Sequence, residues 1–209
     1  YGTQLLEWLE TYTFPTEARF ADAGWSADQS QLFLDLLLAH GTTSALVFST
    51  SHKVAAEALF SAADGYNMAI TTGKVMMDCH APDGVRDETE ASYSESRELI
   101  ERWHGKGRQR YAVTPRFAAT STVQQLTYAG QLVAEYPDVL MQTHWAENHA
   151  EIAWIKELFP ERSSYLDVYD HFGLLGERSV LAHGIHIDDG DRARLAETAG
   201  ADVIDINMG

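Results

Sequence analysis

Three apolar segments of the chain each end in side chains that could do chemistry. "RYAVTPRF" ends in Arg116 and Phe117, "VLMQTHWAEN" contains His144 and Glu147, and "SVLAHGIHI" contains His183. Together these residues offer a guanidinium group, an aromatic face, two imidazoles and a carboxylate. This combination would suit a planar heterocycle that is held over a metal-bound water.

The two histidines are candidate metal ligands. A neutral imidazole at the end of a rigid strand binds Zn²⁺ or Fe²⁺ well, while its second ring nitrogen is held by a nearby acceptor. His144 fits this description, but it also fits a histidine that only bonds a loop carbonyl. His183, which Gly184 follows, has the same two interpretations. Two histidines from separate strand ends favour a metal site but are too few to complete one.

The other candidates also have two interpretations each. Glu147 could carry a proton from a metal-bound water to a ring nitrogen and then to a leaving amine. Alternatively, it is an acidic residue at a helix start, stabilised by the helix dipole. Arg116 follows Pro115, which restricts the backbone and favours a defined position for the side chain. Its alternative is a surface salt bridge in an acidic protein, and that of Phe117 is a place in the core.

Six short apolar segments have the character of strands, with helical patterns between them. The segments are nearly continuous in apolar residues, as is typical of parallel strands that helices cover on at least one face. They are residues 44–50, 68–78, 110–117, 139–148, 179–187 and 201–206. The predicted helices are residues 29–40, 54–63, 87–104, 122–135, 148–158, 163–171 and 188–198. We interpret the N-terminal "LLEWLETYTFP" as a packing segment.

This alternating order fits either a parallel barrel or a doubly wound open sheet. The sequence has no G-x-G-x-x-G after the first strand and no G-x-x-x-x-G-K-[ST], which removes the main support for a nucleotide-binding open sheet. We therefore predict an α/β fold, a parallel (β/α)₈ TIM-type barrel of which residues 1–209 form a single partial domain covering roughly the central strands 2–7. In such a barrel the active site lies at the carboxyl ends of the strands.

Composition limits the classes of partner. Asp and Glu outnumber Lys and Arg by 31 to 15, a formal net charge of −16, so a nucleic acid polymer would be repelled. No apolar run approaches the roughly 20 residues that cross a bilayer, so we expect no membrane anchor. A single cysteine, Cys79, suits a reducing compartment and predicts a cytoplasmic location. The chain starts at Tyr1 without Met, so we expect it to be a piece of a longer protein.

Four motifs, in this order, resemble the guanine deaminases of the amidohydrolase superfamily over nearly the whole chain. They are "YGTQLLEWLETYTFPTEARF", "VTPRF", "QTHWAEN" and "LAHG". The resemblance implies zinc-dependent hydrolysis of guanine to xanthine and ammonia, as in purine catabolism, with attack by a metal-bound hydroxide on the amino-bearing carbon. Fe²⁺ in place of Zn²⁺ and a homodimer are further expectations.

The resemblance also implies a role for each candidate residue. His144 would bind the metal and approach the substrate, and Glu147 would be the proton shuttle. His183 would stand beside the metal and position the hydroxide. Arg116 would bind the polar edge of the guanine ring, and Phe117 would lie against its face. The alternatives are another deaminase or chlorohydrolase of the same superfamily, or an incomplete fragment without activity.

Two parts of the family's metal site are absent from the sequence. Members of the family have an H-x-H pair after the first barrel strand and a metal-binding Asp after the eighth, and neither lies within these 209 residues. Residues 202–209 also replace the family's usual ending of the seventh strand. We therefore expect the isolated 209-residue chain to bind metal weakly and to turn over little substrate.

Overall fold

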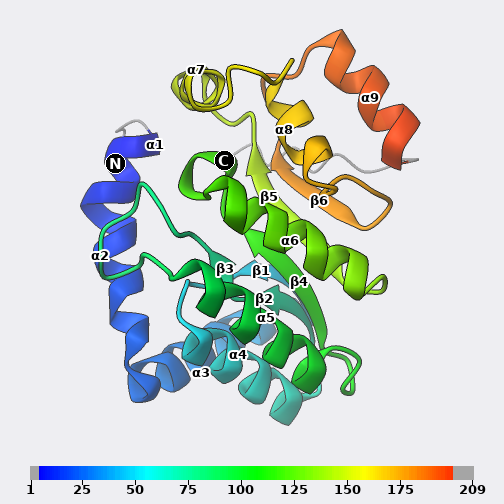
Figure 1. Ribbon diagram of the computed structural model, residues 1–209. Coiled ribbons are helices and arrows are strands. Elements are labelled where there is room, and N and C mark those ends of the chain that lie inside the picture. Colours follow the sequence, from blue (N-terminus) through cyan, green and yellow to red (C-terminus); the bar gives the residue numbers. More distant parts are fainter. Residues whose placement is uncertain (1–4, 200–209) are drawn as a thin grey trace.

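The computed structural model describes residues 5–199, and a curled, wholly parallel sheet runs through it (Figure 1). Its strands are β1 (Ser44–Phe48), β2 (Ala69–Gly73), β3 (Val75–Met76), β4 (Arg110–Pro115), β5 (Leu140–Trp145) and β6 (Ser179–His183). β2 and β3 both pair with β4 in one register, so they act as one strand that is interrupted at Lys74. The strand predicted over residues 201–206 lies outside the described residues.

The order of the strands decides between the two predicted architectures. Neighbouring strands follow the chain order β1-β2-β4-β5-β6, with β3 beside β4. A doubly wound sheet would reverse its order at a switch point, where its ligand binds. No reversal occurs among the described strands, so the sheet winds in one direction, as in a (β/α)₈ barrel. The prediction of a partial parallel barrel is confirmed.

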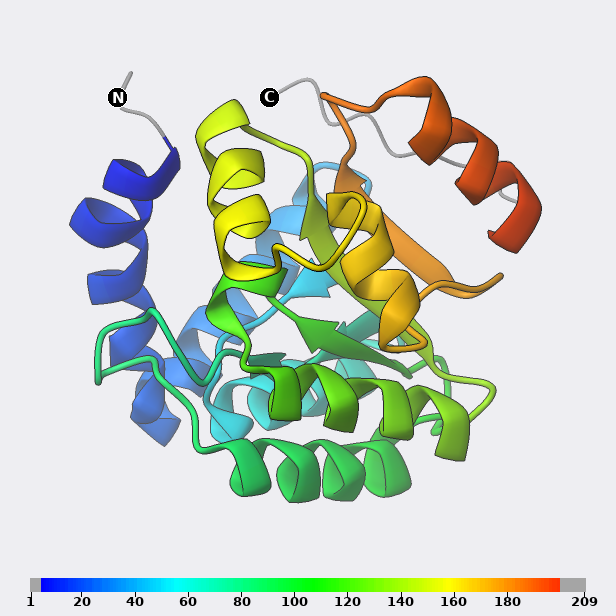
Figure 2. The ribbon, with the colours of Figure 1, turned by 45° about the horizontal axis from the view of Figure 1, so that its top comes forward.

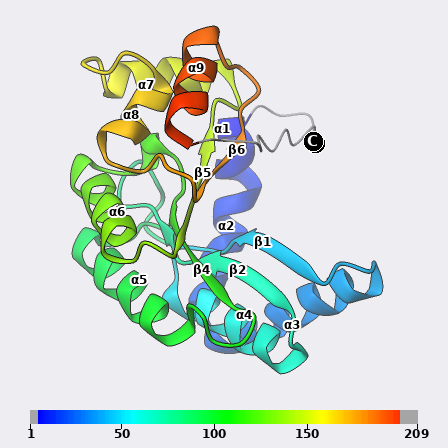
Figure 3. The same ribbon diagram turned by 90° about the vertical axis from the view of Figure 1, so that its right-hand side faces the viewer.

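Helices alternate with the strands and cover the sheet. They are α3 (Ala23–Ala39), α4 (Lys53–Tyr66), α5 (Thr89–Trp103), α6 (Val123–Glu135), α7 (His149–Leu158), α8 (Tyr165–His171) and α9 (Asp189–Ala199), with a 3₁₀ turn η3 (Ala118–Thr120). α4, α5 and α6 pack side by side against β2 and β4 (Figure 1), whereas α7, α8 and α9 gather at the β5–β6 end (Figure 3). Within residues 5–199, no helix is both long and apolar enough to cross a membrane.

The helix predicted over residues 29–40 begins earlier, at Ala23. Asp22 caps it, because the carboxylate accepts a hydrogen bond of 2.7 Å from the backbone N–H of Trp25. The predicted start was wrong because it followed apolar periodicity, which begins later than the N-cap signal. The other predicted helices agree with the structure to within about three residues at each end.

The N-terminal segment forms a continuous helical column beside the sheet (blue in Figure 2). The column consists of α1 (Leu5–Trp8), the π-helical η1 (Leu9–Thr13), α2 (Phe14–Glu17) and the 3₁₀ turn η2 (Ala18–Ala21). In η1, the backbone N–H of Phe14 bonds the carbonyl of Leu9, the longer i→i+5 spacing of a π-turn. Single π-turns inside helices are rare overall, and those that occur often lie at functional sites. We call these four elements the N-terminal column.

Gly130 lies where α6 touches the chain that follows α8, and this contact excludes any larger residue. A Cβ at Gly130 would sit 1.9 Å from the backbone carbonyl oxygen of Phe172. Ala is favoured over Gly in a helix by about 1 kcal/mol, yet we expect Gly130→Ala to destabilise the protein by about 1–3 kcal/mol, because the overpacked backbone must shift. Denaturant unfolding measures the difference.

Gly65 in α4 provides the matched control for this prediction. No atom lies within 4 Å of a Cβ built at Gly65. Gly65→Ala should therefore be neutral or should stabilise the protein by up to about 1 kcal/mol, as helix propensity predicts. Equal unfolding free energies for the two variants would contradict the close contact at Gly130.

Candidate functional site

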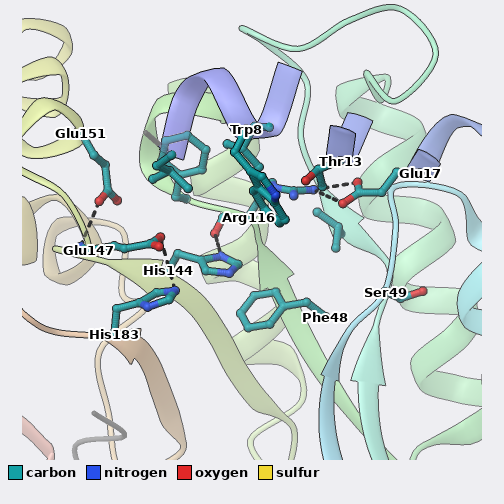
Figure 4. A pocket seen from close by; sticks show the side chains of 14 residues that line it. Trp8, Thr13, Glu17, Phe48, Ser49, Arg116, His144, Glu147, Glu151 and His183 are labelled. Carbon is teal, nitrogen blue, oxygen red and sulfur yellow. Dashed lines mark hydrogen bonds and ion pairs between the residues drawn. The ribbon is translucent and has the colours of Figure 1, made fainter. Parts of the chain in front are cut away.

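A cavity of about 360 Å³ opens at the carboxyl ends of the strands, under the N-terminal column (Figure 4). Side chains from the column, from the strand ends and from α7 line it. They are Leu5, Trp8, Leu9, Thr13, Glu17, Phe48, Ser49, Val75, Arg116, Phe117, His144, Glu147, Glu151 and His183. All five residues that the sequence singled out are among them, so the fold brings together the candidates from three separate strand ends.

Backbone hydrogen bonds between strand ends set the site residues side by side. The N–H of Arg116 donates to the carbonyl of Met76 at 3.1 Å, and the N–H of His144 donates to the carbonyl of Arg116 at 3.0 Å. On the other side of β5, Trp145 pairs with His183 in the parallel register. The sheet itself therefore fixes the spacing of Arg116, His144 and His183.

The ring of His144 is held in one tautomer. Its Nδ1 lies 2.8 Å from the backbone carbonyl oxygen of Arg116, which can only accept, so Nδ1 carries the proton and Nε2 keeps a free lone pair. The ring of Phe48 packs against it with centroids 4.1 Å apart. Burial lowers the pKa of His144 to about 4, so the imidazole is neutral at neutral pH. One nitrogen thus bonds a carbonyl, and the other can bind a ligand.

Glu147 and His183 face each other at the cavity. Oε2 of Glu147 lies 3.3 Å from Nε2 of His183, and the rings of His183 and His144 stack with centroids 5.5 Å apart (Figure 4). Ala146 and His183 have φ values of 51° and 79°, in the left-handed region that residues other than glycine rarely adopt. Such strain persists only where the surrounding structure enforces it, and it clusters at functional sites.

Glu151, which the sequence analysis did not single out, caps α7 and anchors Glu147. The residue is 1% exposed, and its carboxylate accepts hydrogen bonds from the backbone N–H groups of Glu147 at 3.0 Å and Asn148 at 3.1 Å, and from the hydroxyl of Tyr165 at 2.8 Å. Asn148 and Glu151 form a capping box. Burial raises the pKa of Glu151. The helix-start alternative considered for Glu147 thus describes Glu151, and the capping-box spacing in the sequence was a signal for it.

Arg116 lies in the wall of the cavity and not in a surface salt bridge. Its side chain is 10% exposed, and NH1 donates to both carboxylate oxygens of Glu17, at 3.0 and 2.7 Å. The guanidinium carbon lies 5.2 Å from the ring centroid of Phe14. Phe117 belongs both to the cavity wall and to the core, because it is 4% exposed and meets Trp154 edge-on at 6.1 Å. The core interpretation of Phe117 is therefore compatible with a place at the site.

The packing interpretation of "LLEWLETYTFP" was incomplete. Leu9 and Phe14 are buried in a small core under the column, but Trp8 and Thr13 line the cavity together with Glu17. The helical spacing of these residues indicated a common face. It did not show that the face covers a cavity.

Two imidazoles among the described residues have the chemistry of metal ligands. The free Nε2 of His144 and the imidazole of His183 are nitrogen donors of the kind that Zn²⁺ binds. Across residues 5–199, no group of three or more His, Cys, Asp or Glu side chains is placed to hold a metal ion. The chemistry of the two histidines is compatible with a partial ligand set, and their binding of a metal stays a prediction.

Cys79 lies apart from the residues that line the cavity. Burial raises the pKa of its thiol to about 12, and the carboxylate of Asp78 adds to the shift. Because the thiolate is the reactive form, we expect iodoacetamide to label Cys79 at neutral pH at least about tenfold more slowly than in the urea-unfolded chain. Mass spectrometry of timed samples measures both rates, and equal rates would contradict the burial of the thiol.

The chain is similar to known proteins in both sequence and structure. Residues 2–207 match the model of the Amidohydrolase family. Guanine deaminase of Escherichia coli (strain K12) is 51% identical over 198 residues, which are 95% of this chain and 45% of that protein. A solved structure of E. coli guanine deaminase matches with a TM-score of 0.93 over 95% of this chain and 46% of that one.

A second solved structure carries a ligand. It is guanine deaminase from C. acetobutylicum with bound guanine in the active site, and it matches with a TM-score of 0.87 and 30% identity, over 94% of this chain and 47% of that one. This chain therefore spans less than half the length of these relatives.

Proposed function

Because the chain belongs to the amidohydrolase family, we propose that the protein hydrolyses guanine to xanthine and ammonia. The observation that carries this proposal is the cavity, in which a guanidinium, an aromatic ring, two imidazoles and a carboxylate meet at the strand ends. The 51% identity to a guanine deaminase supports the choice of guanine among purines.

In the proposed reaction, water adds to the amino-bearing carbon of guanine and ammonia leaves. The carboxylate of Glu147 takes one proton from the attacking water and gives it to the ring nitrogen beside the amino-bearing carbon. It then moves the second proton of that water from the new hydroxyl group to the amine, which leaves as ammonia while the carbonyl of xanthine forms. His183, 3.3 Å from Glu147, positions the attacking oxygen. Arg116 donates hydrogen bonds to the polar edge of the base, and Phe117 contacts the face of the ring.

Membership of the family implies a metal cofactor. We propose zinc, with iron(II) as the alternative, held by Nε2 of His144 and by His183. When bound, the ion lowers the pKa of a water molecule and so supplies a nucleophile at neutral pH. The chain prepares for it by fixing the His144 tautomer through the Arg116 carbonyl and by burying the ring so that it stays neutral.

Three wider properties belong to the same proposal. Residues 1–209 form a single partial barrel domain, the protein is cytoplasmic, and it assembles as a homodimer. The single cysteine supports a reducing compartment, and the net charge of −16 supports a small-molecule substrate over a nucleic acid polymer. Light scattering of the full-length protein tests the dimer.

Ammonia release by the purified full-length protein tests the function. We expect release from guanine, with xanthine as the second product, and little or none from adenine, cytosine or triazines. Release from another of these compounds but not from guanine would reassign the protein to another deaminase or chlorohydrolase. A zinc-loaded protein that acts on none of them would reject the enzymatic proposal.

A further inference from the structure

The ion pair of Arg116 and Glu17 bears on which purines the cavity accepts. NH1 of Arg116 donates to both carboxylate oxygens of Glu17, and the pair lies in the cavity wall (Figure 4). The two side chains are 10% and 15% exposed, so water screens their charges weakly. The opposite charges therefore compensate each other inside the site.

The contact with Glu17 leaves part of the guanidinium free to bind a ligand. It uses NH1, whereas Nε and NH2 of Arg116 also carry N–H donors. No acceptor for those two nitrogens is found among residues 5–199. Arg116 can therefore donate hydrogen bonds into the cavity while Glu17 compensates its positive charge.

Among the described side chains that line the cavity, Arg116 is the main attraction for an anion, and the proposed metal ion would add the same attraction in every variant compared below. Of the described residues that line the cavity, it alone has a permanent positive charge. The other ionisable groups there are Glu17, His144, the facing pair Glu147 and His183, and Glu151. The two imidazoles carry no permanent charge, and ionised carboxylates would repel an anion. Compensation of Arg116 by Glu17 thus sets how the cavity treats anionic ligands.

We propose that Glu17 is a specificity-determining residue: it forms with Arg116 a pair without net charge that can still donate hydrogen bonds, so that the cavity holds neutral purines and rejects anionic ones. The inference rests on the proposed function, because that reaction turns guanine, a neutral base, into xanthine, a stronger acid that loses a proton near neutral pH. An uncompensated guanidinium in this sheltered wall would retain the xanthine monoanion. With Glu17 in place, ionisation weakens binding of the product and favours its release.

Product inhibition of the full-length protein tests this inference. Xanthine is titrated into guanine hydrolysis at pH values on both sides of its ionisation, for the unsubstituted protein, Glu17→Gln and Glu10→Gln. Glu10 lies exposed on the same N-terminal column and does not line the cavity, so its variant removes the same charge without touching Arg116. The inhibition constant of xanthine is compared with the KM of guanine at each pH.

The expected results differ in direction between the variants. In the unsubstituted protein and in Glu10→Gln, xanthine should inhibit more weakly as it ionises. In Glu17→Gln, the monoanion should inhibit roughly tenfold more strongly than in the unsubstituted protein, the effect of one modest charge interaction. The KM of guanine should change far less, because guanine carries no charge for Arg116 to attract.

Three outcomes separate the possibilities. If xanthine inhibits the unsubstituted protein more strongly as it ionises, the inference is overturned. This measurement needs only the unsubstituted protein, so it tests the inference even if Glu17→Gln does not fold. Equal inhibition of Glu17→Gln and Glu10→Gln by the monoanion overturns it as well. If the unsubstituted protein releases no ammonia from guanine, the proposed function fails separately, and calorimetric binding of xanthine at the same pH values still tests the role of Glu17.

Discussion

Glu147→Gln is expected to lower the kcat of the full-length protein by on the order of 10²-fold or more, the usual contribution of general acid–base catalysis. The amide of Gln has nearly the shape of the carboxylate but cannot accept and return a proton. Glu147 reaches the site beside His183, at 3.3 Å, so its loss removes the group that would move protons there. Steady-state kinetics with guanine, together with metal analysis, measures the effect.

The metal content of Glu147→Gln should stay near that of the unsubstituted protein, because His144 and His183 remain. Glu157→Gln is the matched control, since Glu157 lies exposed on α7 and away from the cavity lining. Its kcat should be unchanged. Normal turnover in Glu147→Gln would remove Glu147 from the mechanism, and a parallel loss of metal would assign it a structural role.

Glu151→Ala should cause the second large effect, on both stability and turnover. Truncation removes the carboxylate that accepts from the partly buried backbone N–H groups of Glu147 and Asn148. It also leaves the buried hydroxyl of Tyr165 with only its longer donor contact, to the carbonyl of His144 at 3.3 Å. We expect a loss of about 3 kcal/mol in unfolding free energy. Because Ala146 holds a left-handed conformation just before Glu147, release of this anchor lets the loop relax and displaces the Glu147 carboxylate. Displacements of about 1 Å can cost up to about 10²-fold in rate.

Two milder substitutions show whether the anchor itself is responsible. Glu151→Gln keeps an amide oxygen that can accept from the backbone, so its losses should be smaller than those of Glu151→Ala. Tyr165→Phe removes a single donor and leaves both backbone contacts of Glu151 in place. Denaturant unfolding and kcat are measured for all three variants. A destabilised Glu151→Ala protein with normal kcat would mean that other contacts position Glu147.

The buried hydroxyls behind Glu151 connect this anchor to the strand ends. Tyr169 donates to the carbonyl of His144 at 2.8 Å and lies 3.2 Å from the hydroxyl of Tyr165. It also accepts the backbone N–H of Ala118 at 3.1 Å, just beyond β4. A chain of hydrogen bonds thus runs from α7 through α8 to β5 and to the turn after β4, so changes at Glu151 should be felt at His144 as well.

The local patterns of the sequence determined the elements of this fold and indicated several residues of the candidate site. Apolar runs predicted the strands, helical spacing predicted the helices, and their alternation predicted a parallel βα fold, because burial imposes these periods wherever a strand or helix forms. Polar residues at the ends of such strands, among them Arg116, His144 and His183, must lie at one edge of a parallel sheet.

Only the tertiary structure decided which side chains meet. Glu17 reaches Arg116 because the N-terminal column folds across the strand ends. The hydrophobic periodicity of a segment predicts a helix but does not predict where that helix will pack. The left-handed backbone of His183 is likewise enforced by its surroundings and has no signal in its own residue type. The sequence alone thus determined the elements and five candidate residues. The packing of the column places Glu17 beside Arg116 and encloses the cavity, and the packing of α7 anchors Glu147 through Glu151. Such contacts depend on where distant segments lie in space.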